Sequence, residues 1–256
     1  MRSITITTLI AMTISATAFS SSFGVSDPFT GSSCANTTCD VIGATQTYDI
    51  QKGTFSTTGT SGQFDIFTNF ANSTLTPFSD GNGANLYIGD LLFTVNGVVK
   101  YGVALTTHSE TGNPGAATGG TNVVAGTLYQ VLSVANGVET STQAMGSSTD
   151  IYRPNTNVWL RNYSGALSSL AAGTVSVIAN GNGSTTGALY DIRVGFNNDL
   201  TTGFVNDFSA ANFGVSFASA ICANDIMTGT NTPEPVTMGL IGAGLVGMGL
   251  LRRFKK

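Results

Sequence analysis

Residues 91–101 read LLFTVNGVVKY, and this stretch decides the expected fold class. Asn96 and Gly97 separate two runs that are rich in apolar and β-branched residues. Both central residues of a two-residue type I′ turn need a positive φ angle, which Asn and Gly adopt more readily than other residues. We therefore predict a hairpin in which residues 91–95 pair antiparallel with residues 98–101.

Short runs of the same kind recur along the chain between clusters of Gly, Asn and Ser. Phe64, Ile66 and Thr68 fall on one face of an expected strand, because side chains alternate between the two faces of a strand. Asn136-Gly137 is a second two-residue turn signal. We predict about nine strands, at residues 47–50, 62–70, 85–93, 98–106, 126–135, 158–161, 173–178, 188–196 and 213–218.

Outside the two ends of the chain, helical periodicity is hard to find, which favours an all-β fold. The roughly 210 residues between the ends fit one domain. We therefore expect residues 19–229 to form an antiparallel β-sandwich, and the strand number favours a jelly roll.

The first 18 residues have the three regions of a secretory signal peptide. Arg2 supplies the positive charge, an apolar-rich stretch follows, and small residues end at Ala18. We predict cleavage after Ala18, with Ser20 to Ser22 as the alternative. The remainder of the chain is then exported.

Residues 230–256 form a tail of three parts. The tripeptide Pro233-Glu234-Pro235 comes first, and residues 236–251 follow without a charged side chain. As a helix that run would be about 24 Å long, somewhat shorter than the ~30 Å hydrocarbon core of a bilayer. We predict a transmembrane helix with the bulk of the protein outside, because basic residues are retained on the cytoplasmic side. The basic residues that end the tail are Arg252, Arg253, Lys255 and Lys256.

This order of tripeptide, apolar run and basic end resembles the PEP-CTERM sorting signal of Gram-negative bacteria. The resemblance implies that Pro233, Glu234 and Pro235 are a recognition element for exosortase, a membrane-embedded protease that cuts near the tripeptide. It also implies transient anchoring in the inner membrane, followed by delivery to the cell surface or the exopolysaccharide matrix. Without the resemblance, the two prolines could serve as a rigid spacer before the helix.

A weaker resemblance covers the middle of the chain. The segments at 64–66, 91–93, 101–105, 126–129 and 222–226 look like those of surface proteins that carry this tail. Such proteins are similar to β-sandwich carbohydrate-binding modules in strand count and size. This resemblance carries over neither catalytic residues nor a ligand.

The exported part is acidic and poor in charge. Five of the ten basic residues and one of the 14 acidic residues lie in the two terminal signals, which leaves a net charge near −8. Nucleic-acid binders need clustered Lys and Arg, so a nucleic-acid partner is not expected. A surface of Ser, Thr, Asn and Gly suits a hydrated polysaccharide matrix.

No catalytic constellation stands out in the sequence. His108 is the only histidine, which excludes multi-histidine zinc sites, and we expect it to be exposed in a loop. A pair of carboxylates could hydrolyse glycosides, and Asp65, Asp90, Asp191 and Asp207 lie on or near expected strands. Acid catalysts need a buried carboxyl group with a raised pKa, and no carboxylate stands out in the sequence as one. We therefore predict that the protein is not an enzyme.

Asp80 and Asn82 are candidate calcium ligands, because alternate oxygen side chains and intervening glycines resemble the start of a calcium-binding loop. Residues 197–199 and 224–225 could serve similarly. The alternative is an Asx-rich turn that needs no ion.

Three cysteines lie in the exported part, where disulfides persist. We favour a local bridge between Cys34 and Cys39, which leaves Cys222 buried or available for another bond. A bridge from Cys222 to either of the other two is the alternative, and it would join the two ends of the domain.

Trp159 is the only tryptophan of the chain. It could stack on a sugar, or it could be the largest residue of the core. The core interpretation is favoured, because a single tryptophan between apolar strand neighbours needs no ligand.

Taken together, these patterns favour an exported surface or matrix protein with a structural or adhesive role. A calcium-stabilised carbohydrate-binding module is the first alternative. A secreted polysaccharide hydrolase is the second.

Overall fold

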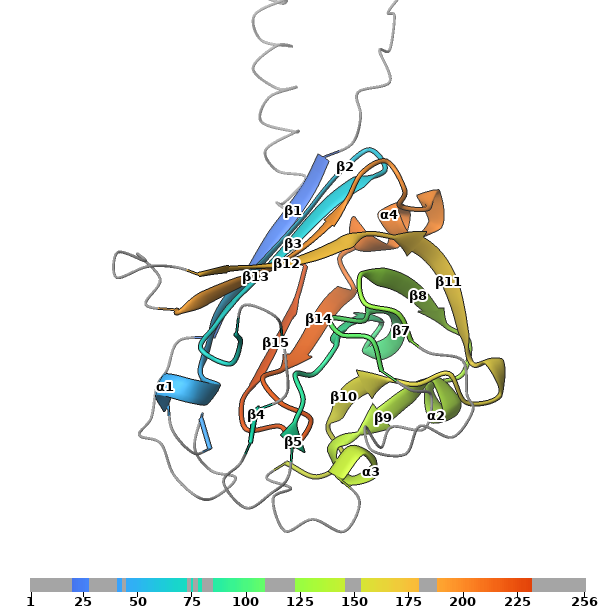
Figure 1. Ribbon diagram of the computed structural model, residues 1–256. Coiled ribbons are helices and arrows are strands. Elements are labelled where there is room, and N and C mark those ends of the chain that lie inside the picture. Colours follow the sequence, from blue (N-terminus) through green and yellow to red (C-terminus); the bar gives the residue numbers. More distant parts are fainter. Residues whose placement is uncertain are drawn as a thin grey trace, which may run out of the picture.

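The computed structural model describes residues 20–27, 41–42, 45–72, 75, 78–79, 85–108, 123–145, 153–179 and 188–231. These residues form two large antiparallel sheets packed face to face (Figure 1). The five-stranded sheet has the order β1-β2-β3-β13-β12. Its strands are β1 (Ser20–Ser26), β2 (Ile50–Thr58), β3 (Ser61–Thr68), β13 (Tyr190–Phe196) and β12 (Thr174–Ala179).

The six-stranded sheet has the order β11-β8-β7-β6-β14-β15. Its strands are β11 (Leu167–Ala172), β8 (Thr127–Val131), β7 (Val98–Val103), β6 (Leu91–Val95), β14 (Phe213–Ala218) and β15 (Ile226–Thr230). Two small sheets join β4 (Phe78–Ser79) to β5 (Asn85–Leu86) and β9 (Val138–Thr140) to β10 (Asn157–Leu160). The helices are α1 (Thr45–Tyr48), α2 (Val134–Gly137), α3 (Ser141–Met145), α4 (Thr202–Phe208) and the 3₁₀ turn η1 (Tyr163–Gly165).

Phenylalanines fill the space between the two sheets. Phe64 of β3 and Phe93 of β6 meet edge to face, with their ring centroids 5.2 Å apart. Phe204 and Phe208 bring α4 onto the same cluster and are completely buried. Aromatic side chains bury much apolar area each, so this cluster supplies a large part of the core.

The predicted hairpin at Asn96-Gly97 is confirmed. Val95 pairs with Val98, and the φ angles of Asn96 and Gly97 are 54° and 77°. The second turn signal is wrong, because Asn136 and Gly137 lie in the short helix α2. That helix connects β8 to β9, which pairs with β10 and not with β8, so no tight hairpin is needed there.

Strands rich in Ser, Thr and Gly were not predicted from the sequence. The edge strand β1 reads SSSFGVS, and only Phe23 and Val25 of its residues pack on the core. Most of β2, together with β11 and β15, was missed in the same way. The expected strand at 47–50 is largely wrong, because α1 extends to Tyr48 and β2 begins at Ile50.

The antiparallel β-sandwich is confirmed, but its strand order departs from a jelly roll, which contains two Greek keys. In the six-stranded sheet, β14 returns beside β6, the first strand of the consecutive group β6, β7 and β8, as in a Greek key. In the five-stranded sheet, β13 lies beside β3, the last strand of the group β1, β2 and β3.

One continuous segment passes from one sheet to the other at Gly173, between β11 and β12. A Cβ atom at Gly173 would lie 2.6 Å from the carbonyl oxygen of Gly195 and 2.7 Å from the ring of Phe196. Only glycine fits this close approach without displacing the backbone. The bend therefore closes one side of the sandwich.

Candidate functional site

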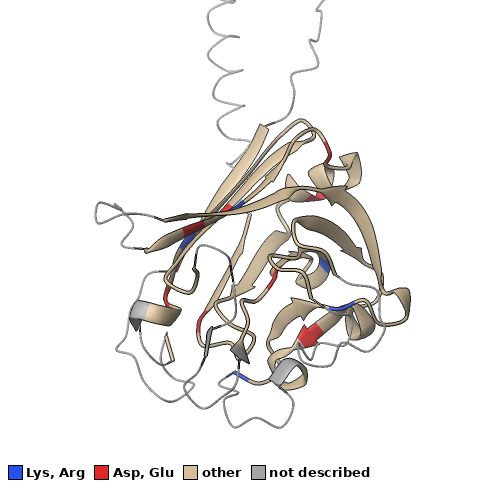
Figure 2. Cartoon of the chain, in the orientation of Figure 1, with Lys and Arg blue, Asp and Glu red and all other residues tan. Residues whose placement is uncertain are grey.

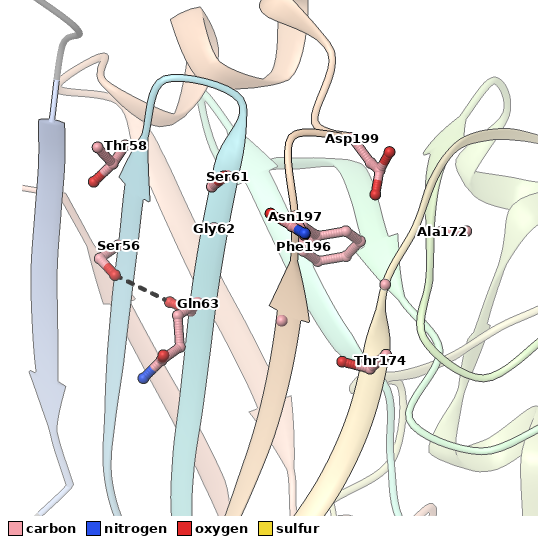
Figure 3. Close-up of a pocket in the computed structure, with 12 residues that line it drawn as sticks. Ser56, Thr58, Ser61, Gly62, Gln63, Ala172, Thr174, Phe196, Asn197 and Asp199 are labelled. Atoms are coloured by element: carbon pink, nitrogen blue, oxygen red, sulfur yellow. Dashed lines mark hydrogen bonds between the residues drawn. The ribbon is translucent and has the colours of Figure 1, made fainter.

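A groove of about 480 Å³ opens on the outer face of the five-stranded sheet, next to the bend at Gly173 (Figure 3). Four elements supply its walls: the β2–β3 hairpin, the bend between β11 and β12, the end of β13 and the loop after it. The lining residues are Ser56, Thr58, Ser61, Gly62, Gln63, Ala172, Gly173, Thr174, Gly195, Phe196, Asn197 and Asp199.

Strand alternation explains why the groove is polar. Phe64 and Ile66 of β3 point into the core, so Gln63 points outward, and Gly195 of β13 is its register partner. Thr174 of β12 is in turn the partner of Gly195. A Cβ atom at Gly195 would meet only the Thr174 hydroxyl, at 3.5 Å, so the space above this residue is open.

The groove offers neutral hydrogen-bonding groups. Hydroxyls of Ser and Thr and the amides of Gln63 and Asn197 line it, while Asp199 is the one ionisable residue among the lining residues. The ring of Phe196 is almost completely buried at the groove. Such a surface can bind an uncharged polyhydroxylated chain by hydrogen bonds.

A network of charged residues lies beside the groove on the same face. Gln63 Nε2 donates a hydrogen bond to Asp65 Oδ2 at 2.7 Å, which links the groove to the network. Arg193 binds Asp65 through Nε at 2.5 Å and Asp191 through Nη2 at 2.9 Å. Burial and the neighbouring charge of Asp65 raise the pKa of Asp191. Figure 2 shows that charged residues are sparse along the described chain, most of which is tan.

The two candidate carboxylates Asp65 and Asp191 thus share one guanidinium. The other two carboxylates of the sequence-based hydrolase hypothesis lie elsewhere. Asp207 of α4 accepts hydrogen bonds from Lys100 Nζ and Tyr101 Oη, both at 2.6 Å. Asp90 is completely buried.

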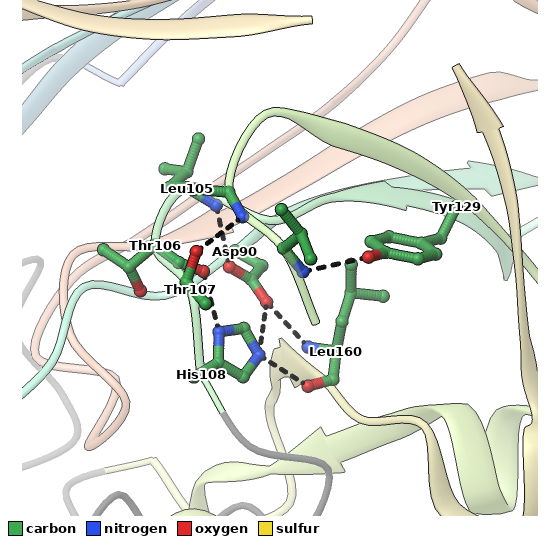
Figure 4. Close-up of polar contacts among 9 residues, drawn as sticks. Asp90, Leu105, Thr106, Thr107, His108, Tyr129 and Leu160 are labelled. Carbon is green, nitrogen blue, oxygen red and sulfur yellow. Dashed lines mark hydrogen bonds and ion pairs between the residues drawn. The ribbon is translucent and has the colours of Figure 1, made fainter. Parts of the chain in front are cut away.

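His108 is buried, so its expected exposure in a loop is wrong (Figure 4). A β-bridge to Val123 holds its backbone. Its Nδ1 lies 3.0 Å from the carbonyl oxygen of Thr106, and its Nε2 lies 2.9 Å from that of Leu160. The neutral ring can donate to only one of these oxygens. Burial lowers the pKa of His108 to about 4.

Asp90 connects the same region to two backbone segments. It accepts hydrogen bonds from the amides of Leu105 and Leu160, at 3.0 and 2.9 Å, and its Oδ2 lies 3.4 Å from His108 Nε2. Burial raises the pKa of Asp90 well above its usual range. Asp90 and His108 therefore link the chain beside β6 and β7 to the end of β10 in the interior. No local pattern in the sequence indicates this long-range contact.

Trp159 is completely buried, as the core interpretation predicts. Its ring packs against His108 at 4.1 Å and against Tyr87 at 5.8 Å between centroids. The indole therefore presents no exposed face to a sugar in this structure.

The segment around Cys222 is hydrogen-bonded to a distant part of the chain, near residues 42–50. Asn224 Nδ2 donates to the carbonyl oxygen of Ile42 at 2.8 Å, and Asp225 Oδ2 accepts from the Ile50 amide at 2.6 Å. Cys222 is completely buried, and its thiol contacts the side chain of Asn224. The oxygens proposed as calcium ligands at 224–225 therefore bind protein groups. The described residues contain no group of three or more side chains suited to a metal ion.

Several predicted site residues lie outside the described residues. They are Cys34 and Cys39, Asp80 and Asn82, the tripeptide Pro233-Glu234-Pro235, and the basic residues Arg252, Arg253, Lys255 and Lys256. The predicted signal peptide and the apolar run 236–251 lie outside them as well. Among the residues that are described, no helix has the length and apolar character to cross a membrane.

The last described residue, Asn231, is firmly attached to the body. Its amide donates to the carbonyl oxygen of Phe213 at 2.7 Å, and its side-chain Nδ2 donates to that of Phe208 at 2.9 Å. Asn231 is also buried. The tripeptide therefore begins two residues after a fixed point of the sandwich.

Comparison with known proteins identifies the end of the chain. The family described as the PEP-CTERM protein-sorting motif matches residues 231–253. Comparisons with curated proteins and with solved structures gave no significant match. The chain thus carries the sorting signal of an exosortase substrate, and this signal implies export and transient anchoring in a membrane before processing. The described body of the chain is an antiparallel β-sandwich.

Proposed function

We propose that the processed protein has a structural or adhesive role outside the cell and binds neutral polysaccharide in the groove of the five-stranded sheet. The lining of the groove carries this proposal: hydroxyl and amide groups dominate it, and Gly195 leaves open space above its backbone. Sugar hydroxyls are matched by such donors and acceptors. The low charge of the exported part fits a hydrated matrix of this kind.

Binding of the exported protein to the polysaccharide of its own cells tests the proposal. The decisive variant is Gly195→Gln, because the new side chain would point into the groove and meet little else. Ser176→Gln is the matched control, since Ser176 is exposed on the same face of β12 and does not line the groove. We expect at least a tenfold loss of affinity for Gly195→Gln and none for Ser176→Gln. Equal affinity of all three proteins would refute the groove as the binding site.

We further propose that the protein is not an enzyme. Asp65 and Asp191 are both bound to Arg193 and do not face each other across the groove, which supports this proposal. Inverting and retaining glycosidases place two carboxyl groups on opposite sides of the scissile bond. Release of reducing ends from the same polysaccharide by the purified protein would contradict the proposal.

A calcium-stabilised carbohydrate-binding module is the second candidate, because Asp80 and Asn82 remain candidate ligands. In that case, chelation of calcium should lower both the thermal stability and the affinity for polysaccharide. A purely structural protein should respond to chelation in neither measurement.

A further inference from the structure

Both ends of the exported body lie at one end of the sandwich, next to α4 (Figure 1). Ser20, at the start of β1, pairs with Thr58, which precedes the β2–β3 turn. Asn231 is bonded through its side chain to Phe208, the last residue of α4. The β2–β3 turn is itself attached to this region, because the amide of Leu200 donates to the carbonyl oxygen of Thr60 at 2.9 Å.

A shallow pocket of about 440 Å³ lies between the β2–β3 turn and α4. Residues of the β2–β3 turn and of α4 line it, and all of them are uncharged: Gly59, Thr60, Thr202, Val205, Asn206 and Ser209. The nearest acidic residue of α4, Asp207, is bound to Lys100 and Tyr101. We call this surface the α4 face. Its uncharged lining limits repulsion by an anionic lipid surface, although the exported part has a net charge near −8 and Asp199 is exposed three residues before α4.

The tether between the body and the apolar run is short. Five peptide steps separate Asn231 from residue 236, where the apolar run begins. Fully extended, they span at most about 17 Å. The headgroup layer of one leaflet takes up about 5–8 Å of this length. The fixed attachment at Asn231 therefore lies within about 10 Å of the lipid surface while the chain is anchored.

We infer that the α4 face is the surface that lies against the membrane in the anchored, unprocessed protein, and that its partner there is the lipid headgroup layer. The predicted signal peptide joins the body at the same end, through Ser20. Neither terminal segment then has to pass around the sandwich. The opposite end, with α2, α3 and the β9–β10 sheet, points away from the membrane (Figure 1).

The experiment uses the full chain in liposomes, without exosortase, with a small fluorescent amino acid at one of two exposed positions. Asn206 reports on the α4 face, and Ala135 of α2 reports on the opposite end. The quencher is a lipid that carries a nitroxide on its headgroup. We expect quenching at Asn206 to exceed that at Ala135 at least threefold. Equal quenching, or stronger quenching at Ala135, would overturn the inference.

Two further samples test whether the short tether and the lipid, and not exosortase, cause the stronger quenching at Asn206. Twelve Gly and Ser residues inserted after Asn231 should make the quenching at the two positions similar, since a longer tether lets the body turn. An undiminished difference would contradict the role of the short tether. Quenching at Asn206 that appears only after exosortase is added would assign the face to the enzyme and not to lipid. Because no polysaccharide is present, the result is independent of the proposed function.

Discussion

At the level of single residues, the interior contains a histidine and a carboxyl group that a small domain would ordinarily keep in water. Charged side chains are costly to bury, so their protonation states shift to compensate. His108 and Asp90 meet this cost by binding backbone groups of two separate segments, at Leu105 and at Leu160. The pair therefore makes the stability of the fold depend on pH.

We predict that His108 makes a destabilising contribution that grows as the pH falls from 6.5 to 4. The pKa of His108 is lowered to about 4 in the folded state, so in this interval only the unfolded chain takes up the proton. The shift corresponds to a loss of about 3 kcal/mol in the free energy of unfolding at pH 4. Urea unfolding at several pH values would measure it.

The matched variant for this prediction is His108→Gln, which removes the titrating ring. Between pH 6.5 and 4, the wild type should lose about 3 kcal/mol of stability relative to this variant. The raised pKa of Asp90 acts with the opposite sign and is present in both proteins. Parallel pH profiles for the two proteins would show that His108 does not cause the loss.

A second prediction concerns the bend at Gly173. Gly173→Ala should lower the free energy of unfolding by about 1–3 kcal/mol, because the added methyl group would overlap a carbonyl oxygen and a buried ring. Gly195→Ala is the control, since its nearest contact would be an ordinary one at 3.5 Å. It should change stability by less than about 0.5 kcal/mol. Similar losses in both variants would contradict the steric explanation.

At the level of elements, helix α4 and the β6–β7 hairpin use glycine for different reasons. Gly203 lies in the exposed first turn of α4 with nothing near its missing Cβ, whereas Gly97 has a φ angle of 77°. Gly203→Ala should stabilise the protein by up to about 1 kcal/mol, because alanine favours helix. Gly97→Ala should destabilise it by about 1 kcal/mol. Thermal unfolding of the two variants tests both expected changes in stability. A shift of the melting temperature in the same direction for both variants would contradict the different roles of the two glycines.

The same elements show how far the sequence alone reaches. The β6–β7 hairpin could be predicted because Asn96-Gly97 and its apolar flanks specify the turn locally. Strand β1 could not, because serine has no preference for strands and its pairing with β2 is decided by Phe23 and Val25 meeting a distant core. The turn signal Asn136-Gly137 gave a wrong prediction, because β8 before it pairs with β7 and β11 whereas β9 after it pairs with β10.

The sequence could predict the polar, largely uncharged character of the groove, but not its position or its lining residues. A surface of Ser, Thr, Asn and Gly follows from composition, but the meeting of Gln63, Thr174 and Asn197 depends on a register between three strands that are far apart in sequence. The burial of His108 depends on a carbonyl oxygen 52 residues away. No local pattern contains such contacts.

At the level of the whole molecule, the sorting motif follows the folded sandwich almost directly. The body ends at a buried residue, and the recognition tripeptide follows after one further residue. Exosortase must therefore act close to a folded surface. A cut near the tripeptide would leave the last strand, β15, in the six-stranded sheet.

Mass spectrometry of the protein recovered from outside the producing cells tests directly whether the chain is exported and cut at both ends. The account predicts a polypeptide that lacks residues 1–18 and ends near Pro233-Glu234-Pro235, without the apolar run 236–251. The same cells without exosortase should retain the full C-terminal tail in the membrane fraction. An intact chain of 256 residues found in the cytosol of cells that contain exosortase would contradict the account.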